Sequence, residues 1–319
     1  MRLDASALLR LFHARTSLSQ EAIGRLTGLS QSMVSQLLSG KRELRDVLKF
    51  RRFLEGLGAP RAPATPADRE RDETTKLLAR SAQVAMGAAD IDPLQWSGPD
   101  VPSSSGTAPP RVTSVDVTRV ATATKTLRAT DYQLGGGSCL NAIMTQLAYA
   151  YRLLTATELT QDVGRQMCRA IADLHNLAGW ASFDVGRYST AASHLSRALE
   201  QAQYIEEPSL SANVLYRMGR LHLHRGHAPQ ALRFLQLGQI AAQDSGCERT
   251  VALMCANVAW AYAVLGDGKR SGESLARAYD AFARAQEPAD PWVGFFYEAD
   301  LDALSGVIHA ALPVPASRS

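Results

Sequence analysis

The polar and apolar positions after residue 112 follow a helical pattern. No run of alternating β-branched residues is longer than VTSVDV, while Ala, Leu, Arg and Gln dominate this part of the chain. These residue types favour helices over strands. Residues 5–58 contain shorter stretches of the same kind. The pattern therefore predicts an all-α protein.

The segment Ser19–Leu44, SQEAIGRLTGLSQSMVSQLLSGKREL, has the pattern of a helix-turn-helix. Gly24 stands where two crossing helices need a small residue, and Gly28 stands where the tight turn between them needs a glycine. The predicted inward positions are Ile23, Leu29, Val34 and Leu37, and the predicted helix N-caps are Ser19 and Ser30. Further helices are expected around Ala5–Arg15 and Leu48–Leu57, which would complete a small bundle.

Composition changes sharply after residue 58. Residues 59–111 contain most of the fourteen prolines together with Ser- and Gly-rich stretches, which is typical of a linker. Within it, Asp68–Ala89 is predicted as one helix with a thin apolar stripe, either docked or isolated. We therefore expect three parts and a tail: a helix-turn-helix domain at 1–58, a linker at 59–111, a repeat domain at 112–312 and a tail at 313–319.

The charge is divided unevenly between these parts. Residues 1–60 carry ten Lys/Arg and five Asp/Glu, a net charge of +5, although the whole chain carries only +3. The excess basicity therefore lies at the N-terminal end, as expected where one end of a protein faces a polyanion.

The N-terminal motif resembles the Cro/repressor-like helix-turn-helix of bacteria over roughly residues 5–58. The resemblance implies that the second helix enters the major groove of double-stranded DNA. It implies base-reading roles for Gln31, Ser32, Ser35 and Gln36, and phosphate contacts for Gln20, Lys41, Arg42 and Arg45. Because one such helix reads only a short half-site, a homodimer on a palindromic operator is also implied.

Turn glycines recur in the C-terminal part at intervals of forty residues: Gly186, Gly226 and Gly266. A small residue stands twelve positions after each of them, which allows paired helices to approach closely. The pattern resembles the tetratricopeptide repeat, most clearly in Gly186–Leu199, although the usual period is 34, so a HEAT-like solenoid is also open. The resemblance implies an α-solenoid, with an earlier helix pair at Cys139–Leu154 and Glu158–Leu174 and a C-terminal cap at Pro291–Leu312.

The combination of a helix-turn-helix with such repeats resembles peptide-sensing regulators of Gram-positive bacteria, and actinobacterial regulators in which LGGG precedes the repeats. The resemblance implies a peptide or small-molecule effector. Gly135–Gly137 is expected to be a flexible hinge. Asn176, Asn213 and Asn257 lie in expected first helices, which line the concave side of a solenoid, and an amide can donate to and accept from a peptide backbone. This trio is the candidate ligand site.

Other chemistry is not indicated. The histidines of HLHRGH have no neighbouring carboxylate that would complete a metal site, and the four cysteines form no CxxC pair. We expect no catalytic residues, no metal and no cofactor, and therefore no enzyme. The chain has no apolar run of membrane-spanning length and no signal-peptide pattern at Met1, which predicts a cytoplasmic protein without membrane contact. The alternative function is an interaction scaffold whose repeats bind partner proteins and whose N-terminal bundle has no role on DNA.

Overall fold

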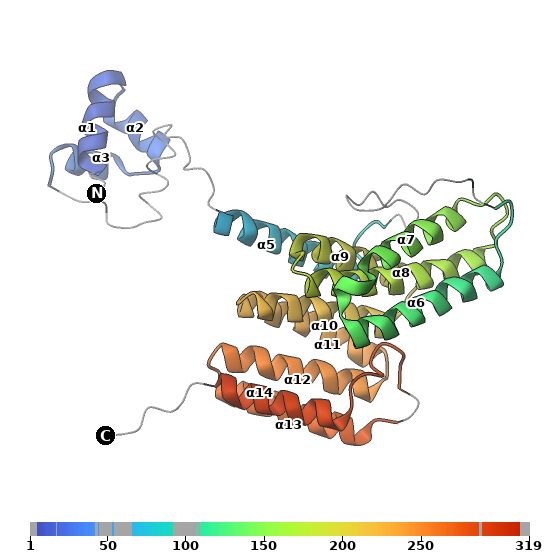
Figure 1. The fold of residues 1–319 in the computed structure, drawn as a ribbon. Helices are drawn as coiled ribbons and strands as arrows, with labels where there is room; N and C mark the ends of the chain where they lie inside the picture. The colour runs from blue at the N-terminus through green and yellow to red at the C-terminus, as the bar shows by residue number, and fades with distance from the viewer. Residues whose placement is uncertain are drawn as a thin grey trace, which may run out of the picture. The chain divides into compact units, whose positions relative to one another are not determined.

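The protein is all-α, as predicted (Figure 1). The computed structural model describes residues 5–16, 18–41, 44, 53, 66–91, 107, 109–286 and 289–312. These residues contain thirteen helices and no strand. The chain divides into two compact units, Met1–Asp72 and Glu73–Ser319. Among the described helices, none is both long and apolar enough to cross a membrane.

Among the described residues of the first unit before Pro66, three short helices pack around one small core. They are α1 (Ala5–Thr16), α2 (Gln20–Thr27) and α3 (Gln31–Leu38). Phe53 is buried in the same core. It is the one described residue of the expected helix Leu48–Leu57, whose other residues lie outside the described part of the chain.

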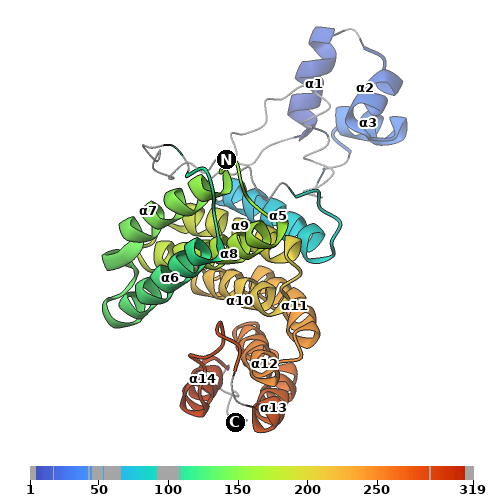
Figure 2. The ribbon, with the colours of Figure 1, turned by 90° about the vertical axis from the view of Figure 1, so that its right-hand side faces the viewer.

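The second unit is a run of stacked helix pairs (Figure 2). Its helices are α5 (Pro66–Ala85, which begins in the first unit), α6 (Ser114–Leu134), α7 (Gly136–Leu154), α8 (Gln161–Asp184), α9 (Tyr188–Tyr204), α10 (Pro208–His224), α11 (Ala228–Asp244), α12 (Glu248–Val264), α13 (Gly268–Arg284) and α14 (Glu298–Ala311). The pairs α8/α9, α10/α11 and α12/α13 form the central part of the stack.

Helix length explains the repeat of forty residues. Each of the helices α10 to α13 has 17 residues, and three residues join each of them to the next. The turn glycines Gly186, Gly226 and Gly266 have φ of 75°, 75° and 78°, a left-handed conformation that disfavours other residues. The predicted turn positions are therefore confirmed.

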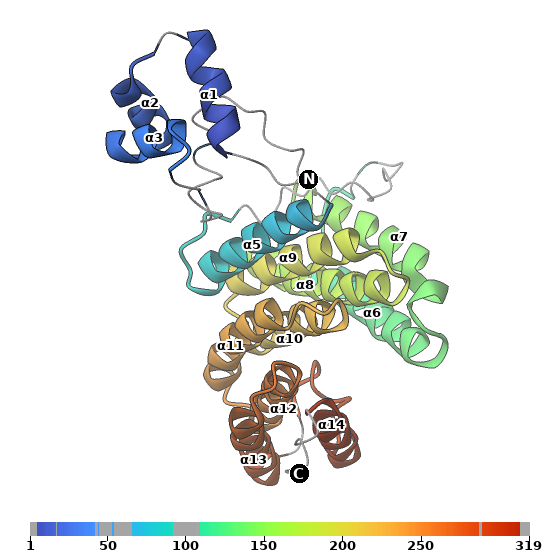
Figure 3. The ribbon, with the colours of Figure 1, turned by 90° about the vertical axis from the view of Figure 1, so that its left-hand side faces the viewer.

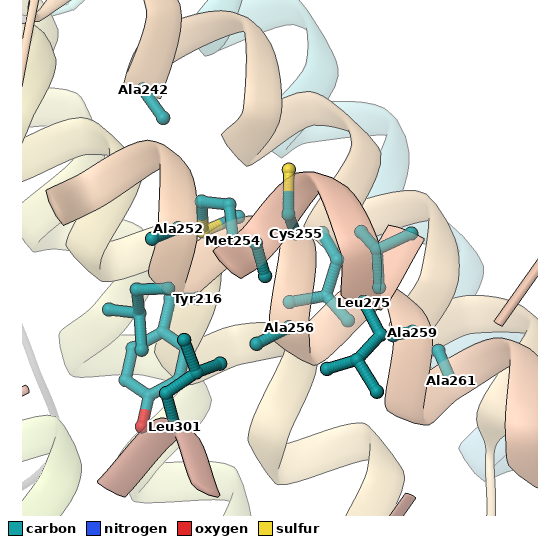
Figure 4. Packing of buried hydrophobic residues seen from close by; sticks show 14 of the residues in the cluster. Tyr216, Ala242, Ala252, Met254, Cys255, Ala256, Ala259, Ala261, Leu275 and Leu301 are labelled. Carbon is teal, nitrogen blue, oxygen red and sulfur yellow. The ribbon is translucent and has the colours of Figure 1, made fainter. Parts of the chain in front are cut away.

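The first helices of neighbouring pairs form an inner row. α8 contacts α10, α10 contacts α12, and the row is extended by α6 at one end and α14 at the other. Next to this row, the side chain of Met254 in α12 fills the space left at Gly238 of α11, where a Cβ would lie 2.1 Å from Met254 Cε. Figure 4 shows this part of the core, where Leu301 of α14 lies beside Tyr216 of α10.

α5 is docked on the second unit. Thr74, Ser81 and Val84 are buried, and Val84 packs in the same cluster as residues of α9 and α10. The guanidinium of Arg80 pairs with the Glu200 carboxylate of α9 at 2.9 Å, and Figure 3 shows the two helices side by side. Of the two alternatives left open for Asp68–Ala89, the docked helix is the one observed.

Three expected elements differ from the structure. Glu158–Leu174 does not form a helix of its own, because its helix continues through the following residues as the 24-residue α8. The expected cap Pro291–Leu312 is helical only from Glu298, and residues 291–295 form a turn. Gly135–Gly137 forms a packed corner between α6 and α7: a Cβ at Gly136 would lie 2.6 Å from Ala181 Cα.

Candidate nucleic-acid interface

The turn between α2 and α3 is built by the residues that the sequence pattern singled out. Gly28 has φ of 68°, and a Cβ at Gly24 would lie 2.7 Å from the carbonyl oxygen of Leu29. Both positions therefore need glycine, one for its backbone conformation and one for the close approach. The hydroxyl of Ser30 accepts a hydrogen bond from the N–H of Met33 at 3.3 Å, which caps α3.

Burial determines which side of α3 faces outward. The four predicted inward residues are all buried, with Ile23, Val34 and Leu37 at 0% exposure and Leu29 at 8%. They share a core with Ala5 and Leu9 of α1. Since Val34 and Leu37 hold one side of α3 against this core, the other side is left for solvent or a partner.

Three of the four expected base-reading residues lie on that outward side. Gln31, Ser32 and Ser35 are exposed, whereas Gln36 is half-buried. A glutamine amide can pair bidentately with the N6 and N7 of adenine, while a serine hydroxyl discriminates little between bases. Of the two expected glutamine amides, the exposed one is therefore that of Gln31, the first residue of α3.

The expected phosphate contacts are described only in part. Gln20 is the first residue of α2 and is half-buried, and Lys41 is exposed just after α3. The N–H of Lys41 donates to the carbonyl of Gln36 at 2.9 Å, which holds the lysine backbone at the end of the helix. Arg42 and Arg45 lie outside the described residues.

One further cation lies near the end of α3. Arg10 of α1 is exposed, and its Nη1 lies 3.8 Å from the position that a Cβ at Gly40 would occupy. Arg10 is not among the predicted DNA contacts, because the helix-turn-helix motif gives no information on how α1 crosses α3. The sequence did include Arg10 among the ten Lys/Arg that make residues 1–60 basic, but did not place it beside α3.

The candidate ligand trio is inside the second unit. Asn176, Asn213 and Asn257 lie on α8, α10 and α12, the inner row, and are exposed by only 0%, 3% and 0%. Asn176 Nδ2 donates to Asn213 Oδ1 at 2.9 Å, while Asn257 Nδ2 donates to the carbonyl of Leu253 in its own helix at 2.8 Å. The amides of Asn176 and Asn213 are therefore hydrogen-bonded to each other, whereas the amide of Asn257 bonds within its own helix. Ligand contact by the trio stays a prediction.

A buried group of histidines lies nearby and was not predicted. His175 Nδ1 and His194 Nδ1 are 2.9 Å apart, and the Tyr151 hydroxyl is 2.9 Å from His175 Nε2. Burial, with smaller contributions from His194 and Arg197, lowers the pKa of His175 well below its usual value. Burial therefore favours the neutral form of His175, and the short contact between the two rings is suited to holding α8 against α9.

Fold and site together define a protein with an N-terminal helix-turn-helix unit followed by paired helices. In agreement with this, residues 4–66 match the family model described as a helix-turn-helix domain. Comparison with curated proteins and with solved structures gave no match. A helix-turn-helix domain indicates DNA binding and is consistent with a regulator that is not an enzyme.

Proposed function

We propose that this protein is a sequence-specific transcription regulator that binds a palindromic operator as a homodimer. The observation that carries the proposal is the outward side of α3, where Gln31, Ser32 and Ser35 are exposed while Val34 and Leu37 anchor the helix. A helix held in this way presents its N-terminal residues to base edges in the major groove.

The distribution of charge supports the proposal. The +5 charge of residues 1–60 suits a phosphate backbone, and Lys41 and Arg10 are exposed close to the end of α3. Contacts with phosphate set the register of the helix on DNA, whereas base contacts supply the sequence preference. A homodimer is proposed because one α3 spans only a short half-site.

The second unit is proposed as a tetratricopeptide-like domain that carries the dimer contacts and senses a peptide or small-molecule effector. Its stacked pairs form an inner row of helices, the surface on which such solenoids bind extended ligands. The protein would then act in the cytoplasm, where its operator is accessible.

The test is a selection of bound sequences from a random DNA pool, followed by titration of the selected site and of random DNA. Gln31→Ala and Gln36→Ala should each lose about 1 to 3 kcal/mol on the selected site and relax the preference at defined bases. Arg42→Ala should weaken binding to all sequences and reduce the salt slope by about 1. Gln133→Ala and Lys125→Ala, exposed residues of α6, serve as matched controls that should change neither.

Two outcomes would contradict the proposal. Equal losses on selected and random DNA for all three variants would remove the assigned roles. Absence of any salt-sensitive DNA binding would favour the interaction scaffold instead.

A further inference from the structure

The connection between α13 and α14 is much longer than the turns between the helices from α8 to α13. Three-residue turns join α10 to α11, α11 to α12 and α12 to α13, whereas residues 285–297 separate α13 from α14. The described part of this connection passes α12 and reaches α10 and α8, and Figure 2 shows it turning back toward α10. It therefore lies on the inner row of the stack.

Trp292 is the centre of this segment and is only 5% exposed. Its indole N–H donates to Asp173 Oδ1 of α8 at 2.7 Å, and its backbone carbonyl accepts from Asn213 Nδ2 of α10 at 2.8 Å. The guanidinium of Arg169 lies over the ring, 4.9 Å from its centroid. Three different side chains thus contact Trp292, one at its indole N–H, one at its ring face and one at its backbone carbonyl.

The residues on either side of Trp292 are also held. The Ser209 hydroxyl donates to the carboxylate of Asp290, and Phe295 stacks on Tyr216 with the ring centroids 6.1 Å apart. Both partners belong to α10. The segment therefore makes side-chain contacts along α10 from its first turn to its middle.

Asp173 is itself positioned for this contact. Arg128 of α6 donates to the same carboxylate oxygen, Asp173 Oδ1, at 2.5 Å. A carboxylate that is paired with a cation is a strong acceptor for an indole N–H. Three helices, α6, α8 and α10, thus contribute to one subsite for an indole ring.

These contacts are of the kind that recognise extended peptides. Side-chain amides bind a main-chain carbonyl, and pockets for particular side chains provide the specificity. A cation over the face of an indole and a carboxylate at its N–H together select tryptophan, because phenylalanine lacks the donor.

We propose that the inner surface between α8 and α10 is a peptide-binding site, and that the chain fills it with its own residues Asp290–Phe296. In trans the site takes a peptide with the same chemistry: a tryptophan preceded by an acidic residue two positions earlier and followed by apolar residues. This deepens the proposed effector role of the second unit and depends on that role. Binding of the peptide displaces the chain's own segment from the inner row.

The test uses the full chain and a fluorescein-labelled synthetic peptide with the sequence of residues 289–297, ADPWVGFFY. The labelled peptide can bind only those molecules in which the chain's own segment has left the site. The apparent affinity is therefore the intrinsic affinity multiplied by the fraction of open molecules. Trp292→Ala should therefore bind the labelled peptide at least about tenfold more tightly than the unaltered chain. Trp260→Ala is the matched control, since Trp260 also lies under an arginine, Arg220, but does not belong to the segment.

Two further arms identify the subsite. A peptide in which tryptophan is replaced by phenylalanine should bind Trp292→Ala more weakly, because it has no N–H for Asp173. The double variant Asp173→Ala/Trp292→Ala should lose the gain in peptide affinity. If Trp292→Ala does not fold, Trp292→Phe keeps an aromatic ring at this position and removes the N–H donor with the five-membered part of the indole, and a smaller gain in affinity is expected.

The result that overturns the proposal is a folded variant, checked by circular dichroism, that binds the peptide no more tightly than the unaltered chain or Trp260→Ala. Equal binding of the phenylalanine peptide would overturn the assigned tryptophan chemistry. Because no DNA is present in this assay, its outcome does not depend on whether the first unit binds an operator. If the protein binds DNA but no variant binds the peptide, the proposed peptide-binding site is refuted and the proposed DNA-binding function is not.

Discussion

The corner between α6 and α7 allows a quantitative test of the packing. A Cβ at Gly136, the first residue of α7, would lie 2.6 Å from Cα and 2.7 Å from the carbonyl oxygen of Ala181. Both atoms belong to the backbone of the 24-residue α8, so neither can rotate away as a side chain can. Gly136→Ala must therefore push α7 away from α8. Overpacking of this kind costs about 1 to 3 kcal/mol, and we expect about 2 to 3 kcal/mol because the obstacle is backbone.

Two other glycines serve as controls. A Cβ at Gly137 would meet Val185 Cγ1 at 3.3 Å, a side chain that can move, so Gly137→Ala should cost less than about 1 kcal/mol. A Cβ at Gly164 in α8 would be in ordinary contact with Leu159 Cδ2 at 3.6 Å. Gly164→Ala should therefore stabilise the protein by about 0.5 to 1 kcal/mol through helix propensity.

The assay is urea unfolding followed by tryptophan fluorescence. All four tryptophans lie after residue 72, so the signal reports the second unit rather than the helix-turn-helix unit. A loss of about 2 kcal/mol would also lower Tm by about 4 to 8 °C in a unit of this size. If Gly136→Ala unfolds within about 0.5 kcal/mol of the unaltered chain, the close approach of α7 and α8 is refuted.

Two further predictions concern the second unit. Burial, with smaller contributions from His227 and Arg225, lowers the pKa of His222 to about 4 in the folded protein. As the pH falls, the imidazole of the unfolded chain is protonated first, so the free energy of unfolding decreases between pH 6.5 and about 4. This decrease amounts to about 3 kcal/mol. In urea unfolding across this pH range, the free energy of unfolding of His222→Leu should therefore depend less on pH than that of the unaltered chain. An equal dependence on pH in both proteins would contradict the prediction. Val84→Ala should cost about 2 kcal/mol, because Val84 anchors the docked α5, and proteolysis between the two units should become faster. An unaltered cleavage rate and an unaltered unfolding curve would show that α5 does not depend on this contact.

Local signals in the sequence predicted the helix-turn-helix well. Gly28 needs a left-handed backbone, Ser30 caps the next helix, and Val34 and Leu37 are spaced to face one core. Each of these properties depends on residues within one or two turns of the chain. Such short-range physics is visible in a sequence, and for that reason the turn glycines of the repeats were also predicted correctly.

Long-range contacts were not visible in the same way. Asn176 and Asn213 occupy the expected inner helices, but their burial depends on partners 37 residues apart and on the carbonyl of Trp292. Trp292 was predicted to lie in a C-terminal cap, since its neighbours in the chain are apolar and nothing local marks a segment that returns to α8. The helix end that was expected at Leu174 is absent, because α8 continues through this position to Asp184 and no Gly or Pro stands there to end it.

The hydrogen bonds of Asn213 restrict which ligands can displace the chain's own segment. Its Oδ1 accepts from Asn176 and its Nδ2 donates to the carbonyl of Trp292, so both ends of this buried amide are engaged. Release of the segment leaves the Nδ2 donor without that acceptor, which costs about 1 to 3 kcal/mol in a buried position. A ligand with a carbonyl group at the same place restores the bond, whereas an apolar molecule of equal size does not. A peptide is therefore favoured over an apolar effector, and it can shift the protein between its two states only by the difference in its affinity for them.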